Sequence, residues 1–325
     1  MLRLGSGHLA AKAIHVFAEL GIADLLRDGE MRAVDLARLT STDAAVLSRV
    51  LRFLATVDVV GTQDGDTFRL TALGATLCSQ TSAVIKENVL LMSSPGYWGA
   101  IGNLLDAVKY GKNAFEGAHG KGFFEYLEHN AAEGAVFNAA MNSSSKAGNA
   151  ATLAAYDFEC AGVIVDVAGG KGSFLESVLR RCPGSRGILF DSASVIESAA
   201  ISAGIADRVT KVPGSFFDRV PAGGDLYVLR RILHDWNDEH AGVILRRCRE
   251  ACHAGAKLLV IEAAPPDEHG SANNWAGLDL LMMILMGGRE RTADDFEQLF
   301  AAAGFTLLRT VRTNSPLWLV EAKAA

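Results

Sequence analysis

The chain has 325 residues, of which 50% are hydrophobic and 21% charged, so it can build a large core and is expected to hold about two domains. Its 31 Lys and Arg against 37 Asp and Glu give a net charge of −6, which argues against binding nucleic acid by neutralising phosphates. The sequence contains no apolar run long enough to cross a membrane, and its first residues lack the charged-then-apolar order of a signal peptide. We therefore expect a soluble, cytoplasmic protein that binds neither nucleic acid nor membrane.

The cysteines are odd in number, and no two of them form a Cys-x-x-Cys pair. This spacing is typical of neither a disulfide framework nor a zinc site. We therefore expect reduced thiols, as in a cytoplasmic protein, and no metal ion. The cysteines are Cys78, Cys160, Cys182, Cys248 and Cys252.

Residues 1–80 have the pattern of three short helices followed by a hairpin. Apolar residues recur at helical spacing, and an Asp-Gly turn separates the two strands. The expected helices lie over residues 10–26, 31–39 and 46–54, and the expected strands over 57–61 and 67–70. This order predicts a winged helix, which either binds DNA or packs against another chain. The third helix carries only two arginines and the hairpin turn is acidic, which favours a packing or dimerisation domain.

Residues 81–155 are expected to be helical, and the pattern changes near Cys160. From there, apolar strands alternate with helices, which predicts a parallel sheet with helices on both faces. The sequence thus predicts a doubly wound α/β domain over residues 156–325, after a helical connector over residues 81–155. The expected connector helices lie over 97–110, 122–129, 131–145 and 148–156. The expected strands lie over 162–167, 187–190, 209–212, 226–229 and 257–262, with a closing antiparallel hairpin over 305–313 and 318–321.

A glycine-rich turn follows the first strand of this α/β domain. Asp166 lies near the end of the strand, and Gly169, Gly170 and Gly172 precede a helix. Glycines allow a sharp turn and let a ligand approach the backbone amides, so the turn predicts a nucleoside-type cofactor. The acid before the glycines argues against the pyrophosphate pattern of a dinucleotide site. Asp191 ends the next strand, where a carboxylate either binds the hydroxyls of a ribose or caps the following helix.

Five motifs follow one another at compatible spacing: Asp166-Val-Ala-Gly-Gly-Lys-Gly, Gly214-Ser-Phe-Phe-Asp218, Tyr227-Val-Leu-Arg-Arg-Ile-Leu-His-Asp-Trp-Asn-Asp-Glu239, Leu258-Leu-Val-Ile-Glu262 and Gly287-Gly-Arg-Glu-Arg-Thr292. Together they resemble the S-adenosylmethionine-dependent O-methyltransferases of the plant caffeic acid and acetylserotonin type, whose bacterial relatives act in natural-product pathways. The resemblance covers essentially the whole chain. It implies a Rossmann-like methyltransferase domain, an N-terminal winged-helix domain that forms a homodimer, S-adenosylmethionine as cofactor and S-adenosylhomocysteine as product.

The resemblance also implies the cofactor contacts. Asp166 and the glycines of the turn would lie against the methionine part, and Asp191 would hold the ribose. Ser215 and Phe216 stand where the family usually has an acid and an apolar residue against the adenine. Arg230 stands where the family commonly has a lysine. Serine is a shorter and uncharged acceptor, so this departure weakens adenine recognition unless water bridges the gap.

His234 follows a predicted strand and is therefore expected at the carboxyl edge of the sheet, where open α/β folds bind ligands. A neutral imidazole is a suitable base for a phenol, whose pKa is near 10. From the residues alone, His234 is either this base or a cap of the following helix. The resemblance implies the base, with Glu262 and Glu290 orienting the ring. Alternatively, Glu262 is only a sheet-edge acid, and Glu290 pairs with Arg289 or Arg291.

The expected acceptor is an aromatic or polyketide-like small molecule with a hydroxyl group. The apolar stretch over residues 279–286 fits either its pocket or simply a buried helix. By resemblance, the acceptor pocket draws on Trp98, Phe137, Met141, Ser144, Arg231, Asp279, Met282 and Met283. Two other classes stay open: a relative with N-methylation, decarboxylation or hydroxylation chemistry, and a non-catalytic winged-helix regulator. The combination of His234, Glu262 and Glu290 disfavours both.

Overall fold

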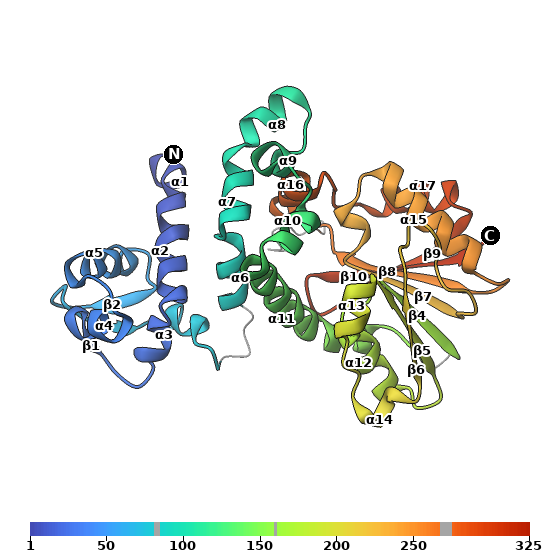
Figure 1. Cartoon of the computed structure of the whole chain (residues 1–325), viewed down its shortest axis with the longest axis horizontal. Helices are drawn as coiled ribbons and strands as arrows, with labels where there is room; N and C mark the ends of the chain where they lie inside the picture. The colour runs from blue at the N-terminus through green and yellow to red at the C-terminus, as the bar shows by residue number, and fades with distance from the viewer. Residues whose placement is uncertain (81–84, 159–160, 267–274) are drawn as a thin grey trace. The chain divides into compact units, whose positions relative to one another are not determined.

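The computed structural model describes residues 1–80, 85–158, 161–266 and 275–325, with only the backbone of residues 146 and 147. The chain divides into two compact units. The first comprises Met1–Gly102 and Phe124–Ser143, and the second comprises Asn103–Phe123 and Ser144–Ala325 (Figure 1). Among the described helices, none has both the length and the apolar character needed to span a membrane. Cys160, one of the five predicted free thiols, lies outside the described residues.

The first unit begins with helices packed on a small antiparallel sheet of order β1-β3-β2. Asp43 is the N-cap residue of helix α5, because its carboxylate accepts the N–H of Val46 at 2.9 Å. The elements are α1 (Leu2–Gly5), α2 (Gly7–Glu19), α3 (Ile22–Leu25), β1 (Met31–Arg32), α4 (Ala33–Thr40), α5 (Ala44–Ala55), β2 (Val60–Thr62), β3 (Thr67–Leu70) and the 3-10 helix η1 (Gly74–Leu77). The predicted winged-helix order is confirmed.

Two details of this sheet differ from the prediction. The first hairpin strand begins at Val60 rather than residue 57, because Asp58 takes a positive φ of 60° and turns the chain after α5. Strand β1 pairs with β3 through Met31 and Phe68, and it was not predicted. A strand of two residues is too short to show an alternating pattern.

The helices between the sheets are more numerous than predicted. They are α6 (Ile85–Met92), α7 (Pro95–Gly102), α8 (Leu104–Tyr110), α9 (Ala114–His119), α10 (Phe123–His129) and α11 (Ala131–Ala155). The predicted helix over 97–110 is two helices, and the predicted pair over 131–145 and 148–156 is the single helix α11. Gly148 does not interrupt α11. A Cβ there would lie 2.9 Å from both Arg230 Nη2 and Leu317 Cδ1, so this glycine permits close packing.

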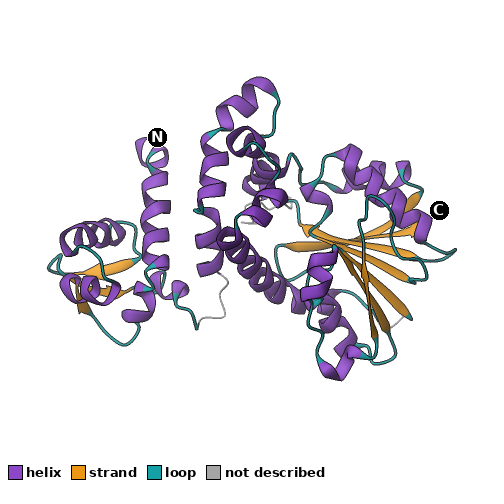
Figure 2. Ribbon diagram, in the orientation of Figure 1, coloured by secondary structure: helices purple, strands orange, loops and turns teal. Residues whose placement is uncertain are grey.

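A seven-stranded sheet of order β6-β5-β4-β7-β8-β10-β9 forms the centre of the second unit (Figure 2). Strands β6, β5, β4, β7 and β8 are parallel, and β10 is antiparallel to both of its neighbours. The strands are β4 (Val163–Val167), β5 (Arg186–Asp191), β6 (Val209–Pro213), β7 (Leu226–Arg230), β8 (Lys257–Ala263), β9 (Phe305–Arg312) and β10 (Leu317–Ala324). The predicted doubly wound α/β domain with a closing hairpin is confirmed.

Helices cover both faces of this sheet (Figure 1). Alternation along each strand produces two cores: Val165 of β4 and Tyr227 of β7 pack toward α15 and α17, whereas Ile164 and Val228 pack toward α12. The helical elements of this unit after α11 are α12 (Ser173–Arg181), α13 (Ala193–Ser198), α14 (Ala203–Ala206), η2 (Leu233–Asp235), α15 (Asp238–Ala251), α16 (Trp275–Met286) and α17 (Ala293–Ala302). The carboxyl ends of the parallel strands form one edge of the sheet, at which Asp191, His234 and Glu262 lie.

Candidate active site

The glycine-rich turn joins β4 to α12 at the carboxyl edge of the sheet. Gly170 and Gly172 take positive φ values of 60° and 84°. A Cβ on Gly169 would lie 2.5 Å from Asp166 Oδ2, so a side chain does not fit there without a shift. A Cβ on Gly170 would meet nothing within 4 Å, which leaves that side of the turn open to a ligand.

Asp191, at the end of β5, is bonded to this turn. Its Oδ2 accepts the N–H of Gly170 at 2.8 Å, and its Oδ1 accepts the N–H of Ser192 at 2.7 Å. Ser192, not Asp191, is the N-cap residue of α13, so the alternative role of helix cap is wrong. Each carboxylate oxygen keeps a further lone pair for a hydroxyl group. Burial raises the pKa of Asp191.

These groups fit the predicted cofactor. Asp166 Oδ2 is buried and accepts no hydrogen bond from the described residues, and it lies under the turn that would hold the methionine part. Ser215 is exposed, and Phe216 lies edge-on to Trp236 with ring centroids 6.0 Å apart. The Nη atoms of Arg230 donate to the hydroxyl and carbonyl oxygens of Ser145 at 3.0 and 3.1 Å. The side chain of Arg230 is thus bonded to α11, and its contact with a cofactor stays a prediction.

His234 lies on η2, just after β7, and only 4% of its surface is exposed. Its Nδ1 is 2.7 Å from Oε1 of Glu290. When Glu290 is ionised, its carboxylate only accepts hydrogen bonds, so the ring proton then lies on Nδ1 and Nε2 is an acceptor. Burial lowers the pKa of His234 to about 4 and raises the pKa of Glu290 to about 7. The imidazole is therefore neutral near pH 7.

Glu262, at the end of β8, binds the backbone of the same loop rather than the ring. Its Oε1 accepts three N–H groups, from Ile232 at 3.2 Å, Leu233 at 3.0 Å and His234 at 3.4 Å. Its Oε2 is 3.8 Å from His234 Nδ1, beyond hydrogen-bond distance. The resemblance implied that both glutamates orient the ring. In the structure Glu290 contacts the ring, and Glu262 holds the turn that carries it.

The alternative roles of His234 and Glu290 are wrong. Asn237, not His234, caps α15, because its side chain accepts the N–H of His240. Glu290 does not pair with either neighbouring arginine: Arg289 and Arg291 both bind Asp238.

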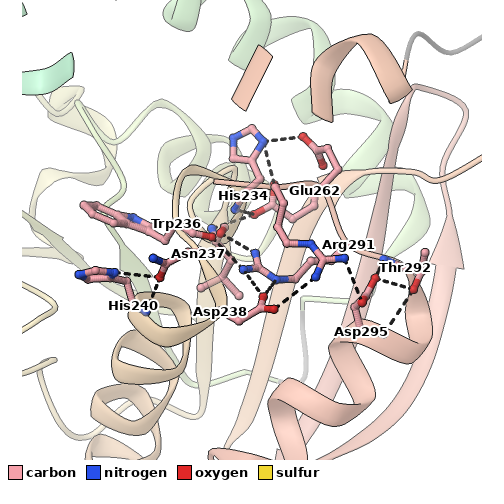
Figure 3. A network of polar contacts seen from close by, with 12 residues as sticks. His234, Trp236, Asn237, Asp238, His240, Glu262, Arg291, Thr292 and Asp295 are labelled. Carbon is pink, nitrogen blue, oxygen red and sulfur yellow. Dashed lines mark hydrogen bonds and ion pairs between the residues drawn. The ribbon is translucent and has the colours of Figure 1, made fainter. Parts of the chain in front are cut away.

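Two further residues lie at the site: Asp235, for which the sequence favours a role in supporting the loop or the cofactor side, and Arg291, which it offers only as a partner of Glu290. Asp235 Oδ1 lies 3.4 Å from His234 Nε2, and burial raises the pKa of Asp235 well above its ordinary value. Arg291 is buried and donates to the carbonyl oxygens of Leu233 and Trp236 (Figure 3). Two arginines flank Glu290 in the sequence, and nothing in the sequence distinguishes the buried one.

One group of the described residues has the composition of a metal site. His234, Glu262 and Glu290 each offer a ligand atom, and these atoms lie within 4.8 Å of one another. Metal–ligand bonds of about 2.0–2.2 Å would hold the ligand atoms of a tetrahedral site more than about 3 Å apart. The 2.7 Å separation of His234 Nδ1 and Glu290 Oε1 is instead that of a direct hydrogen bond.

The predicted acceptor residues fall in both units. Asp279 and the two methionines lie on α16, where Asp279 accepts the N–H of Glu290 at 2.8 Å. Met282 is buried, and Met283 is 39% exposed. Arg231 has a positive φ of 57° directly after β7, and Ser144 lies on the part of α11 in the second unit. Trp98, Phe137 and Met141 belong to the first unit, and their place in an acceptor pocket stays a prediction.

Two family models match the chain: an O-methyltransferase domain over residues 101–306 and an O-methyltransferase dimerisation domain over residues 2–80. The chain belongs to the O-methyltransferase family. It is an S-adenosylmethionine-dependent methyltransferase, it releases S-adenosylhomocysteine, and its dimerisation domain makes it a homodimer. The predicted resemblance, fold and cofactor are thereby confirmed.

Its relatives include O-methyltransferases of natural-product biosynthesis. The chain is 38% identical to a phenazine O-methyltransferase of Lysobacter antibioticus, across 99% of this chain and 95% of the relative. A solved mitomycin 7-O-methyltransferase is 34% identical with a TM-score of 0.93, covering 99% of this chain and 96% of that one. An O-methyltransferase from neocarzinostatin biosynthesis, solved with S-adenosylmethionine and 2-hydroxy-5-methyl naphthoic acid, is 31% identical with a TM-score of 0.86, covering 98% and 96%.

Proposed function

We propose that this O-methyltransferase methylates a phenolic hydroxyl of an aromatic or polyketide-like natural product, with His234 as the general base. The observation that carries the proposal is the 2.7 Å contact between Nδ1 of the buried His234 and Oε1 of Glu290. With Glu290 ionised, this contact holds the ring proton on Nδ1 and leaves Nε2 to accept a proton.

The methyl group of S-adenosylmethionine is already activated by the sulfonium, so the chain has to align the acceptor and remove its proton. Nε2 of His234 takes the phenol proton, and the resulting imidazolium is stabilised by the Glu290 carboxylate. Glu262 keeps the turn of His234 in place through three backbone N–H groups. Asp191 holds the ribose, and the turn over residues 169–172 receives the methionine part. Each of these steps requires only the residues named, and we propose that the reaction is metal-independent.

The acceptor class is supported by the relatives. The names of the relatives and the solved complex describe phenazine, mitomycin and hydroxynaphthoic acid chemistry, and the last of these is a phenol. We place the acceptor beside α16 of the second unit, whose Asp279 accepts the N–H of Glu290.

The buried base favours O-methylation over N-methylation. A phenol near pKa 10 has to lose its proton as the methyl group arrives, whereas a neutral amine attacks without first losing one. Decarboxylation or hydroxylation does not require a base of this kind either.

The test is a methyl-transfer screen with S-adenosylmethionine labelled in its methyl group. Matched pairs of fused aromatic compounds carry either a hydroxyl or an amino group at the same position. The proposal expects label in the phenols and little or none in the amines. Transfer to the amines alone would refute O-methylation as the reaction of this chain.

A further inference from the structure

Two loops meet at the proposed base. We call residues 231–237, which carry His234, the base loop, and residues 287–292, which carry Glu290, the acid loop. The loops touch at the main chain, because a Cβ on Gly288 would lie 2.0 Å from the carbonyl oxygen of His234. The ring contact between His234 and Glu290 joins residues 56 positions apart in the chain, so its geometry depends on how these loops are held together.

Arg291 of the acid loop reaches into the base loop, and its side chain is only 1% exposed. Its Nη1 donates to the carbonyl oxygen of Leu233 at 2.6 Å, and its Nη2 donates to that of Trp236 at 2.8 Å. These two carbonyl groups stand on either side of His234 in the chain. The planar guanidinium therefore bridges both ends of the turn that carries the base.

A buried guanidinium is costly unless its donors and its charge are satisfied. Here Nε and Nη2 of Arg291 donate to Oδ1 of Asp238 at 3.0 and 2.8 Å (Figure 3). Asp238 begins α15, directly after the base loop. The ion pair thus attaches the acid loop to the first turn of this helix as well.

We propose that Arg291 is a positioning residue for methyl transfer, which sets the separation of His234 and Glu290 by tying the acid loop to the base loop. This inference rests on the proposed role of His234 as base. Arg291 acts through the two loops and touches neither reactant. The charged and titratable groups around His234 are Asp235, Glu262, Glu290, Arg231 and Arg291.

Arg289 is a matched control for this proposal. It lies two residues away on the same loop and binds the same Asp238, at 3.3 Å, yet its side chain is 44% exposed. Its guanidinium contacts the carboxylates of Asp238 and Asp295 and no carbonyl group of the base loop. Removing its side chain therefore leaves the bridge between the loops intact.

The experiment compares Arg291→Met, Arg291→Lys and Arg289→Met with the unaltered chain and with His234→Ala. For each we would measure kcat, the pH profile of kcat/KM on a phenolic acceptor, the calorimetric affinity for S-adenosylmethionine, and Tm. Arg291→Met is expected to lower kcat by about 10- to 100-fold, the effect of misplacing a catalytic group by about 1 Å. In Arg291→Met the decrease of kcat/KM at acidic pH, the acid limb of the profile, is expected at higher pH. The Arg291 cation, which opposes protonation of His234 and Glu290, is then absent.

Three further results are expected of these variants. The affinity for S-adenosylmethionine stays within about twofold, Arg291→Lys restores the acid limb but only part of kcat, and Arg289→Met behaves like the unaltered chain. A Lys variant that keeps its cofactor affinity but loses kcat supports the inference even where Arg291→Met fails to fold.

A folded Arg291→Met or Arg291→Lys variant whose kcat and pH profile match those of the unaltered chain would overturn the inference. A loss of affinity for S-adenosylmethionine as large as the loss of kcat in these variants would also overturn it. In either case an inactive His234→Ala leaves the proposed function standing. An active His234→Ala variant overturns both.

Discussion

At the scale of single residues, the site is a buried acid–base pair. Burial acts on the two partners in opposite directions, because it disfavours the cation of His234 and the anion of Glu290. The hydrogen bond at 2.7 Å couples them, so they titrate as a pair. In the proposed mechanism, the active form has a neutral imidazole and an ionised carboxylate, and Nε2 of the imidazole accepts the proton.

This pair predicts how activity depends on pH. The pKa of Glu290 is raised to about 7, so its anion is lost as the pH falls through that value. We expect kcat/KM to decrease as the pH falls below about 7, because the single Glu290 carboxylate is protonated there. In Glu290→Gln this titration is absent, and kcat is lower by about 10²- to 10⁴-fold, the scale of general-base catalysis. Rate profiles from pH 5 to 9 would measure both effects.

The control for that prediction is Glu250→Gln, which alters an exposed carboxylate paired with Arg247 on the surface of α15. Its rate profile should match that of the unaltered chain. A Glu290→Gln variant that retained both its turnover and its acid limb would show that Glu290 does not act on the base.

Most of the candidate residues could be predicted because they end strands or lie in motifs. Asp191, His234 and Glu262 each follow a recognisable apolar strand, and the motifs add Glu290. The roles of Glu262 and Arg291 could not be predicted. Whether a carboxylate binds a ring or three backbone amides, and which of two arginines is buried, depends on how separate loops pack.

At the scale of elements, the site depends on the close approach of two loops. Gly288 permits this approach, because any side chain there would collide with the carbonyl oxygen of His234 and the backbone of Asp235. The negative-φ backbone of this glycine would accept other residues, so the constraint comes from the neighbouring loop.

Gly288→Ala is therefore expected to push the loops apart and to lower kcat by about 10- to 100-fold. Cofactor affinity should change little, since the glycine-rich turn after β4 is untouched. Steady-state kinetics and calorimetry would measure the two quantities. Gly184→Ala is the matched control, because a Cβ there meets nothing within 4 Å. Equal kinetics in the two variants would refute the steric role of Gly288.

The strands and helices could be predicted where the apolar pattern in the sequence extends over several residues. Strands β4, β7 and β8 consist mainly of buried apolar residues, as expected for parallel strands covered on both faces. Helix α11 was predicted in two pieces, because Gly148 and the serines before it resemble a helix end. The packing of Arg230 and Leu317 against that glycine explains why the helix continues, and such a contact is invisible in one local stretch of sequence.

At the scale of the whole molecule, hydrogen bonds and ion pairs connect parts of the second unit that are distant in the sequence. Glu321 of β10 is 2% exposed and accepts hydrogen bonds from Tyr156 at 2.7 Å and Arg309 at 2.6 Å. Lys257 of β8 lies 2.9 Å from the same carboxylate. The residue thus connects three strands with the segment after α11. These hydrogen bonds and nearby cations hold the pKa of Glu321 below its ordinary value, although burial opposes them.

Glu321→Gln is expected to lower the free energy of unfolding by about 1.5–3 kcal/mol, the contribution of a hydrogen bond to a charged group. Because the folded pKa is lowered, this stability is present above the unfolded pKa and is lost as the pH falls through the folded value. The difference between the variant and the unaltered chain should therefore shrink at acidic pH. Urea unfolding at pH 7 and pH 4 would measure it, and an equal difference at both pH values would contradict the account.

The chain has separate domains for dimerisation and for methyl transfer. The dimerisation domain lies over residues 2–80, and the matched O-methyltransferase domain spans residues 101–306. The sequence could predict this order because helical and strand periodicities change along the chain. The acidic net charge argued against nucleic acid as a partner. The positions of Asp191, His234 and Glu262 at or after strand ends predicted that they lie at the ligand-binding edge of the sheet.

The central claim is that His234 removes the proton of a phenolic acceptor. The most direct measurement is single-turnover methyl transfer by His234→Ala, with labelled S-adenosylmethionine and an acceptor from the screen, beside calorimetric binding of the cofactor. The account predicts cofactor binding like that of the unaltered chain and methyl transfer slower by more than about 100-fold. Transfer at nearly the unaltered rate would contradict it.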